Sequence, residues 1–213
     1  MNVFAEEKVA QGYDDYYTTE FGKKVGQIEE QLVRELMQEI PQMPMLELGC
    51  GTGHWTRIFL NMGYEVTATD VAEPMLRVIR SKDLEINIRE LDAMNLPFEN
   101  NSQSLITGIT MLEFVNDQQR VINEIFRVLK PGGWLVLGCL NGESVLGKTA
   151  DNDPVFKHAK FLDAASLKEK LGSFKRVKIN SGVHFSENFE VMDGKPEAKA
   201  YAPAFMAVLV QKG

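Results

Sequence analysis

The sequence predicts an α/β fold, in which a doubly wound, mostly parallel sheet of seven strands carries helices on both faces. Three observations predict it. Short apolar or β-branched segments alternate with amphipathic helical patterns through the middle of the chain, glycines cluster directly after the first of these segments, and no helical pattern separates the last two. Such alternation is typical of βαβ units and therefore of parallel strands. The last strand is expected to run antiparallel to its neighbour.

The first strand is expected at 45–48, directly before the glycine cluster. A helix should follow, because apolar side chains recur there at helical spacing: Trp55, Ile58, Phe59 and Met62. Gly63 stands where a left-handed helix cap belongs. The second strand is expected at 64–69, and Pro74 marks the first turn of the next helix.

The second half of the core continues the alternation. Strands are expected through Ile86 and Ile88 and over 105–111. A helix capped by Asn116 or Asp117 should then bury an apolar face, made of Val121, Ile122, Ile125, Phe126 and Leu129. Residues 130–133 are expected to turn the chain into a strand at 134–140.

The two ends of the chain differ from this core. An amphipathic helix is expected at 26–40, ended by Pro41, and aromatic residues precede it. A short helix should open at Asp163 or Ser166, before strands at 176–180 and 204–210. We expect a single domain over 1–213. Its parts are an N-terminal cap and helix (1–44), a core of alternating strands and helices (45–140), and a C-terminal region (141–213) that contains the last two strands.

Composition excludes several classes of protein. Hydrophobic residues make up 44% and charged residues 25% of the 213 residues, as in ordinary globular proteins. The net charge of −7 argues against binding nucleic acid. No apolar run approaches the ~20 residues of a membrane span, and the N-terminal residues do not resemble a signal peptide. Cys50 and Cys139 are the only cysteines, which favours a reducing, cytoplasmic location.

The glycine cluster Gly49-Cys-Gly51-Thr-Gly53 lies where the first strand meets the first helix. Glycines at alternate positions let the backbone turn tightly and approach a ligand closely. Dinucleotide sites use G-x-G-x-x-G, and here His54 occupies the third-glycine position. This departure disfavours a nicotinamide-dependent oxidoreductase, although an ordinary tight turn would explain the glycines alone.

Two acids strengthen the case for a nucleoside site. Asp70 ends the second strand, where an acid of a doubly wound fold accepts hydrogen bonds from ribose hydroxyls. Asp92 ends the third strand, where a carboxylate can accept a hydrogen bond from an adenine amino group. Taken singly, Asp70 could be a helix cap and Asp92 a turn residue. Together with the glycines, at three successive strand ends, they indicate an adenosine site without a phosphate cradle.

In order and spacing, these features resemble the class I S-adenosylmethionine-dependent methyltransferases. The resemblance rests on Glu47-x-Gly-x-Gly-x-Gly53, Asp70, Asp92-Ala and Leu129-Lys-Pro-Gly-Gly133, and it covers about 13–140. It is nearest to the small-molecule branch that includes quinone-biosynthesis enzymes, whose fold is Rossmann-like. Tyr13-Asp-x-x-Tyr-x-Thr-x-x-Gly22 is also similar to the N-terminal cap of many such enzymes.

The resemblance implies roles for particular residues toward S-adenosyl-L-methionine. Glu47 and the backbone of 49–53, Cys50 included, would hold its methionine part, and Asp70 would bind the ribose. The residues expected around the adenine are Val71, Met75, Asp92, Ala93 and Met94. Thr110 would border the sulfonium, and Tyr13 and Tyr17 would close over the cofactor. Either tyrosine could instead simply anchor the cap.

No catalytic constellation is expected, because methyl transfer from a sulfonium mainly requires alignment of donor and acceptor. No metal site is expected, because the sequence shows no set of ligands with suitable spacing. The histidine that many relatives carry after the fourth strand is replaced by Phe114, so the catalytic residues are unknown. Possible contributors are Glu113, His158, His184 and Tyr201. We expect a small-molecule acceptor, which could be a quinone-like phenol, an amine, a carboxylate or a thiol. A non-catalytic cofactor-binding protein and a macromolecular methyltransferase remain alternatives, as do a monomer and a homodimer.

Overall fold

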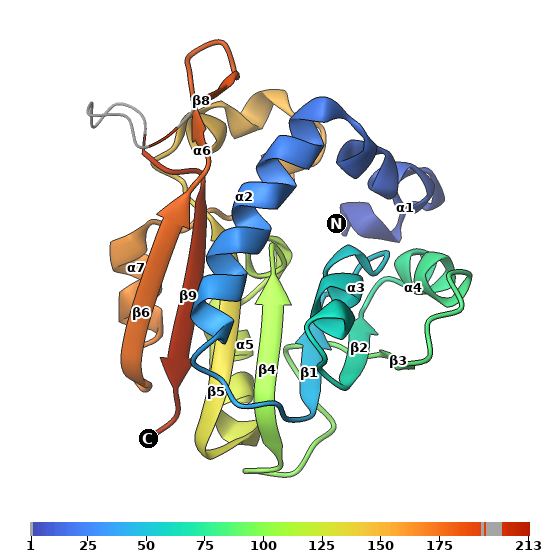
Figure 1. Ribbon diagram of the computed structural model, residues 1–213, viewed down its shortest axis with the longest axis vertical. Coiled ribbons are helices and arrows are strands. Elements are labelled where there is room, and N and C mark those ends of the chain that lie inside the picture. The colour runs from blue at the N-terminus through green and yellow to red at the C-terminus, as the bar shows by residue number, and fades with distance from the viewer. Residues whose placement is uncertain (1, 193, 195–201) are drawn as a thin grey trace.

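The computed structural model describes residues 2–192, 194 and 202–213. A seven-stranded sheet forms its centre, in the order β3-β2-β1-β4-β5-β9-β6 (Figure 1). The strands of this sheet are β1 (Met45–Leu48), β2 (Val66–Asp70), β3 (Asn87–Glu90), β4 (Gln103–Ile109), β5 (Leu129–Leu140), β6 (Lys175–Gly182) and β9 (Phe205–Gln211). The first five run parallel, and β9 is antiparallel to both β5 and β6. The predicted fold class is confirmed.

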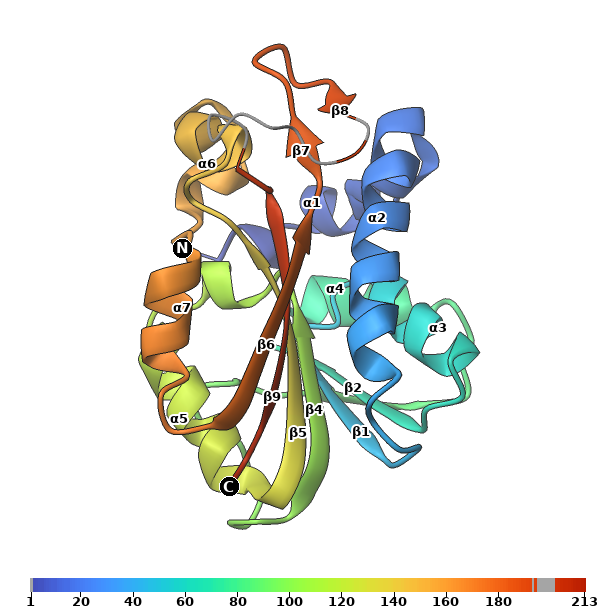
Figure 2. The same cartoon turned by 60° about the vertical axis from the view of Figure 1, so that its left-hand side comes forward.

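Helices cover both faces of the sheet. Figure 2 shows α2 and α3 on one side and α5 and α7 on the other. The helices of these layers are α2 (Glu20–Met37), α3 (His54–Asn61), α4 (Glu73–Arg80), α5 (Gln118–Val128) and α7 (Ala164–Lys170). Alternate residues of the strands face the two layers, so that Val136 packs in the core beneath α2 and Leu135 in the core beneath α5.

Local signals account for most helix boundaries. Asp117 caps α5 by accepting a hydrogen bond from the Arg120 amide at 3.0 Å, and Asp163 caps α7 in the same way. Gly63 follows α3 with φ +86°, the left-handed conformation expected of it. Pro74 lies in the first turn of α4.

Two boundaries differ most from the sequence expectation, and Leu129, expected on a helical face, is instead the first residue of β5. The helix expected at 26–40 begins earlier, because the Thr19 hydroxyl accepts a hydrogen bond from the Gly22 amide and caps α2 at Glu20. The segment 130–133 does not separate two elements. It belongs to β5, where the pairing with β4 shifts register between Gln103 and Leu105, so the proline and glycines form an irregularity within the strand.

The N-terminal residues lie across the end of the sheet where the parallel strands finish (Figure 1). This segment, which we call the cap, comprises η1 (Val3–Ala5), α1 (Glu7–Gly12) and η2 (Tyr13–Thr18), and it leads into α2. Short elements complete the molecule: η3 (Leu112–Phe114), α6 (Val145–Thr149), η4 (Ala150–Asn152), η5 (Phe156–His158), β7 (His184–Phe185) and β8 (Val191–Met192). Among the described residues, every helix is too short or too polar to cross a lipid bilayer.

Candidate cofactor pocket

The glycine loop between β1 and α3 turns back toward the end of β2. Gly49, Gly51 and Gly53 have φ of +69°, +54° and +90°, conformations that favour glycine. The Gly51 amide donates to Asp70 Oδ2 at 2.9 Å. A Cβ on Gly49 would lie 2.5 Å from the Cβ of Met111, whereas one on Gly51 would meet nothing within 4 Å. Open space therefore lies beside the Gly51 backbone.

Asp70 joins the loop to the start of α4. Its Oδ1 accepts a hydrogen bond from the Ala72 amide at 2.8 Å, while Oδ2 holds Gly51. Burial raises the pKa of the Asp70 carboxyl, and hydrogen bonds from backbone amides oppose that rise. Each oxygen has a further lone pair with which to accept a hydroxyl from a ligand.

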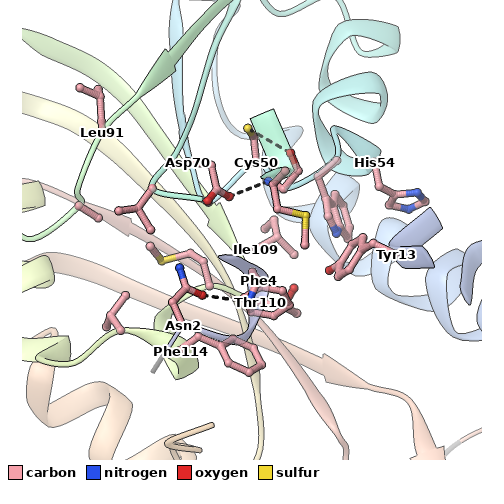
Figure 3. Close-up of a pocket in the computed structure, with 18 of the residues that line it drawn as sticks. Asn2, Phe4, Tyr13, Cys50, His54, Asp70, Leu91, Ile109, Thr110 and Phe114 are labelled. Carbon is pink, nitrogen blue, oxygen red and sulfur yellow. Dashed lines mark hydrogen bonds between the residues drawn. The ribbon is translucent and has the colours of Figure 1, made fainter. Parts of the chain in front are cut away.

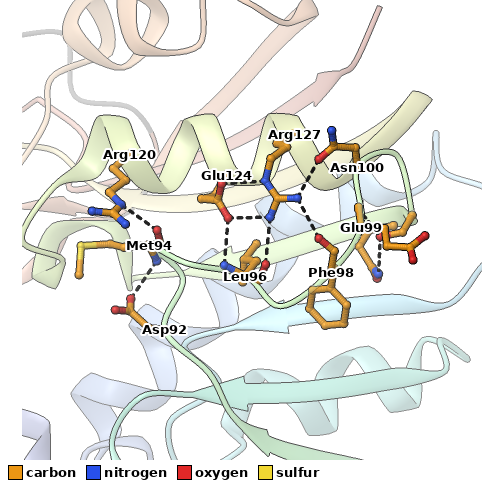
Figure 4. Close-up of polar contacts among 11 residues, drawn as sticks. Asp92, Met94, Leu96, Phe98, Glu99, Asn100, Arg120, Glu124 and Arg127 are labelled. Atoms are coloured by element: carbon orange, nitrogen blue, oxygen red, sulfur yellow. Dashed lines mark hydrogen bonds and ion pairs between the residues drawn. The ribbon is translucent and has the colours of Figure 1, made fainter.

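The loop after β3 carries Asp92 and is held by side chains of α5 (Figure 4). Asp92 Oδ1 accepts a hydrogen bond from the Met94 amide at 2.8 Å. The Arg127 guanidinium donates to the carbonyl oxygens of Leu96 (2.9 Å) and Phe98 (2.8 Å) and also pairs with Glu124. One arginine thus fixes the path of the loop that positions Asp92.

Replacing Arg127 should loosen this loop. We expect Arg127→Ala to lower the free energy of unfolding by about 1–3 kcal/mol, because it leaves loop carbonyls without donors. The matched control is Arg34→Ala, which removes a partly exposed i,i+4 ion pair with Glu30 on a helix and should cost less than ~0.5 kcal/mol. Urea denaturation measures both variants, and equal losses would contradict this role for Arg127.

Thr110 follows β4 with φ +50°, an unusual conformation for a β-branched residue. Its amide donates to the Gly138 carbonyl at 2.7 Å, which ties this turn to β5. Strained residues of this kind concentrate at functional sites.

The cap is attached directly to the glycine loop. The ring of Tyr17 stacks on His54 with a centroid separation of 3.5 Å. Asp14 accepts a hydrogen bond from the Thr52 hydroxyl at 2.6 Å and pairs with Lys82 at 2.5 Å. Desolvation lowers the pKa of His54 to about 4, so the stacked imidazole is neutral at pH 7.

These elements enclose a pocket at the carboxyl edge of the sheet (Figure 3). Most of the residues expected from the sequence line it: Tyr13, Tyr17, Gly49, Cys50, Gly51, Asp70, Val71, Met75, Asp92, Ala93 and Thr110. Glu47, Gly53 and Met94 are not among the lining residues. Gly53 packs closely against the Ile79 side chain, because a Cβ at Gly53 would lie 2.7 Å from Ile79. Met94 packs against the hydrophobic core beneath α5.

Several lining residues were not expected from the sequence: Asn2, Phe4, His54, Trp55, Leu91, Ile109, Met111, Phe114 and Val115. His54, Met111 and Phe114 are adjacent in sequence to motifs or predicted strand ends, and this adjacency could have identified them. No motif adjoins Asn2 or Phe4. The Trp55 Nε1 is buried without a hydrogen-bond partner among the described residues.

Glu47 lies beneath the loop and is only 2% exposed. Its Oε2 accepts a hydrogen bond from the Thr56 hydroxyl at 2.6 Å. Desolvation raises the pKa of Glu47 to about 8. The folded protein therefore keeps a proton that the unfolded chain loses above a pH of about 4.5, the ordinary pKa of the group.

The raised pKa of Glu47 predicts how the stability of the fold changes with pH. Since the folded state binds the extra proton between pH 4.5 and about 8, Glu47 should destabilise the fold increasingly as pH rises through that window. We expect Glu47→Gln to be about as stable as the parent protein at pH 5. At pH 9 it should be more stable by several kcal/mol, at ~1.4 kcal/mol per pKa unit. Urea denaturation at pH 5, 7 and 9 checks this, with Glu65→Gln as the exposed control. A gain independent of pH would contradict it.

Of the four possible catalytic contributors, the three that the structure describes lie in separate elements. Glu113 is buried in η3, and its Oε1 accepts a hydrogen bond from the Leu140 amide. His158 is exposed at the end of η5, and His184 is buried in β7. Tyr201 lies outside the described residues.

Comparison with known proteins agrees with this geometry. Residues 46–137 match the family described as "Methyltransferase domain". An uncharacterized protein of Methanocaldococcus jannaschii is 28% identical over the full length of both chains. A demethylmenaquinone methyltransferase of Staphylococcus haemolyticus is 43% identical over 98 residues, which are 43% of this chain and 41% of that enzyme. The chain thus spans less than half of the named quinone-biosynthesis enzyme that it matches.

Among solved structures, a protein of Thermotoga maritima has the same fold. It is described as an S-adenosylmethionine-dependent methyltransferase, possibly a histamine N-methyltransferase. The TM-score is 0.78 at 24% identity, and the match covers 98% of both chains. At this identity the likeness establishes the fold.

Proposed function

We propose that this chain is a class I S-adenosylmethionine-dependent methyltransferase that methylates a small-molecule acceptor, because residues 46–137 match a methyltransferase domain and the chain is similar to a quinone-biosynthesis enzyme. Its cofactor is S-adenosyl-L-methionine. The observation that carries the proposal is the arrangement at the end of β2, where Asp70 holds the Gly51 amide beside open space in the glycine loop. A carboxylate next to a close-approach backbone suits a ribose and the amino-acid part of this cofactor.

We assign the remaining contacts by position in the pocket. The Asp70 carboxylate accepts the ribose hydroxyls, and Asp92 with the Ala93 backbone binds the adenine edge. Val71 and Met75 pack against the ring. Glu47, buried below the loop, acts on the methionine part through the backbone of 49–53.

The cap closes the site. Tyr13 and Tyr17 line the pocket from above, and the contacts of Asp14 with Thr52 and Lys82 hold them over the glycine loop. Thr110 borders the position of the sulfonium. We propose that 1–213 form one domain, in which 1–44 are the cap and its helix, 45–140 the cofactor core and 141–213 the segments that face the acceptor.

Bound in this pocket, S-adenosyl-L-methionine would supply an activated methyl group on a positively charged sulfur for in-line transfer to a nucleophile of the acceptor. The chain's own task is alignment, which contributes ~7–11 kcal/mol in well-oriented reactions. The carboxyl groups of Asp70 and Asp92, which line this pocket, suit a cationic cofactor.

Two measurements test the proposal. Calorimetry with S-adenosylhomocysteine should detect binding to the intact protein, and no binding would overturn the cofactor site. Incubation of a metabolite panel with methyl-labelled cofactor should transfer label to at least one compound. Binding without transfer to any acceptor would favour the non-catalytic alternative.

A further inference from the structure

A second, larger cavity adjoins the cofactor pocket. It measures about 1070 Å³ and shares with that pocket the walls formed by Phe4, Tyr13, Tyr17, Thr110 and Phe114. Further aromatic side chains come from α2, η5, β7 and the chain between β7 and β8: Phe21, Phe156, Phe185 and Phe189. A molecule in this cavity would reach the Thr110 end of the cofactor pocket, so its place is that of a methyl acceptor.

One buried acid interrupts the apolar wall. Glu29 lies in the middle of α2, is 7% exposed and lines the cavity. The neighbouring Glu30 on the same helix pairs with Arg34 at the surface. By contrast, the Glu29 carboxyl makes no hydrogen bond or ion pair within the part of the chain that the structure describes. An unpaired acid at such a position costs stability, which a ligand of opposite charge would offset.

A second carboxyl reinforces the first. Glu113 is 1% exposed, and its Oε2 is buried without a partner among the described residues. Desolvation raises the pKa of Glu29 to about 8, and the charge of Glu113 adds to the rise. Apart from tyrosines, the cavity has five other charged or titratable lining residues, and all are exposed or only partly buried: Glu6, Lys8, Asp153, Lys157 and His158. The inner end of the cavity therefore favours positive charge.

We propose that the methyl acceptor is an organic amine with an apolar or aromatic body, and that its ammonium group pairs with the Glu29 carboxylate. This inference rests on the proposed methyltransferase function. The rings of Tyr13, Tyr16 and Tyr17 offer faces for cation–π contact with the same ammonium. Since burial raises the pKa of Glu29 to about 8, its carboxyl is largely protonated at pH 7 until an ammonium displaces the proton, whereas a neutral or anionic acceptor would offer the Glu29 carboxylate no opposite charge.

Glu29 also provides a base to which the ammonium can transfer a proton before methylation. An ammonium has no lone pair, so it must lose a proton before its nitrogen can bond to carbon. The Glu29 carboxylate accepts that proton, which converts R–NH3+ and carboxylate into R–NH2 and carboxylic acid. A carboxyl whose pKa is raised to about 8 is a stronger proton acceptor than an ordinary one.

Matched ligands test the inference. Tryptamine, tryptophol and indole-3-acetate share one ring system and carry a cation, a neutral hydroxyl and an anion; benzylamine with benzyl alcohol and benzoate is the smaller set. Calorimetry with the protein saturated by S-adenosylhomocysteine should show each amine binding about 10–100-fold more tightly than its alcohol, and the carboxylate most weakly. If no amine binds more tightly than its matched alcohol, the inference is wrong.

Two variants assign the preference to Glu29. Glu29→Gln keeps the shape and removes the charge, so the amine should lose its advantage over the alcohol. Glu30→Gln alters the adjacent surface acid and should retain it. Both variants should bind S-adenosylhomocysteine as the parent does, which shows that they fold. If the parent protein does not bind S-adenosylhomocysteine, the proposed function is wrong. If Glu29→Gln still binds the amine more tightly than the alcohol, only this inference is wrong.

Discussion

Asp70→Ala is expected to lower the affinity for S-adenosylhomocysteine by about two orders of magnitude or more. The substitution removes a carboxylate placed to accept two ribose hydroxyls, and hydrogen bonds to charged groups contribute ~1.5–3 kcal/mol each. It also frees the amides of Gly51 and Ala72, which Asp70 holds at 2.9 and 2.8 Å. Calorimetry at pH 7.5 measures the change.

The control for this variant lies just before the same strand. Glu65 is exposed and directly precedes the amino end of β2, opposite Asp70, so Glu65→Ala should leave cofactor affinity unchanged. Asp70→Asn separates charge from shape, because the amide retains one acceptor oxygen for a backbone amide. We expect it to fold and to bind S-adenosylhomocysteine more tightly than Asp70→Ala but more weakly than the parent. Parent-like binding by Asp70→Ala would remove Asp70 from the site.

The sequence could predict the sheet and the strand-end residues because both follow from local patterns. Asp70 ends β2 and Asp92 lies two residues beyond the end of β3, and parallel strands bring their carboxyl ends to one edge. No geometric detail was needed to place these two acids beside the glycine loop. The antiparallel β9 followed in the same way from the missing crossover helix.

The contacts of the cap could not be read from local patterns. Tyr17 and His54 stack although 37 positions separate them, and no local sequence pattern around either residue predicts this contact. The early start of α2 has a related cause. Gly22 lowers helix propensity in the sequence, but a Cβ at this position would collide with the Tyr16 backbone, so the glycine is required where the cap turns into the helix.

Glu29 illustrates the same limit for chemistry. In the sequence it is one of several acids on an amphipathic helix, beside Glu30 and Glu35. Only the packing of α2 against the sheet and the cap decides that Glu29 is enclosed while Glu30 remains at the surface. The acid with the most unusual environment on this helix therefore had no distinctive sequence signal.

Gly49→Ala and Gly51→Ala should separate the two functions of the glycine loop. At Gly49 a Cβ would lie 2.5 Å from the Cβ of Met111, and φ is +69°. Left-handed strain of ~1–2 kcal/mol adds to overpacking of ~1–3 kcal/mol. We therefore expect Gly49→Ala to lose about 2–5 kcal/mol of unfolding free energy, measured by urea denaturation.

Gly51→Ala carries only the strain, because a Cβ there meets nothing within 4 Å. Its stability should fall by about 1–2 kcal/mol. The new methyl group would nevertheless occupy the open space that lines the pocket, so affinity for S-adenosylhomocysteine should drop at least as much as in Gly49→Ala. Gly132→Ala, with φ +76° and open surroundings far along the chain in β5, controls for strain alone and should leave affinity intact. If Gly51→Ala binds like the parent, the space beside the Gly51 backbone is not where the cofactor lies.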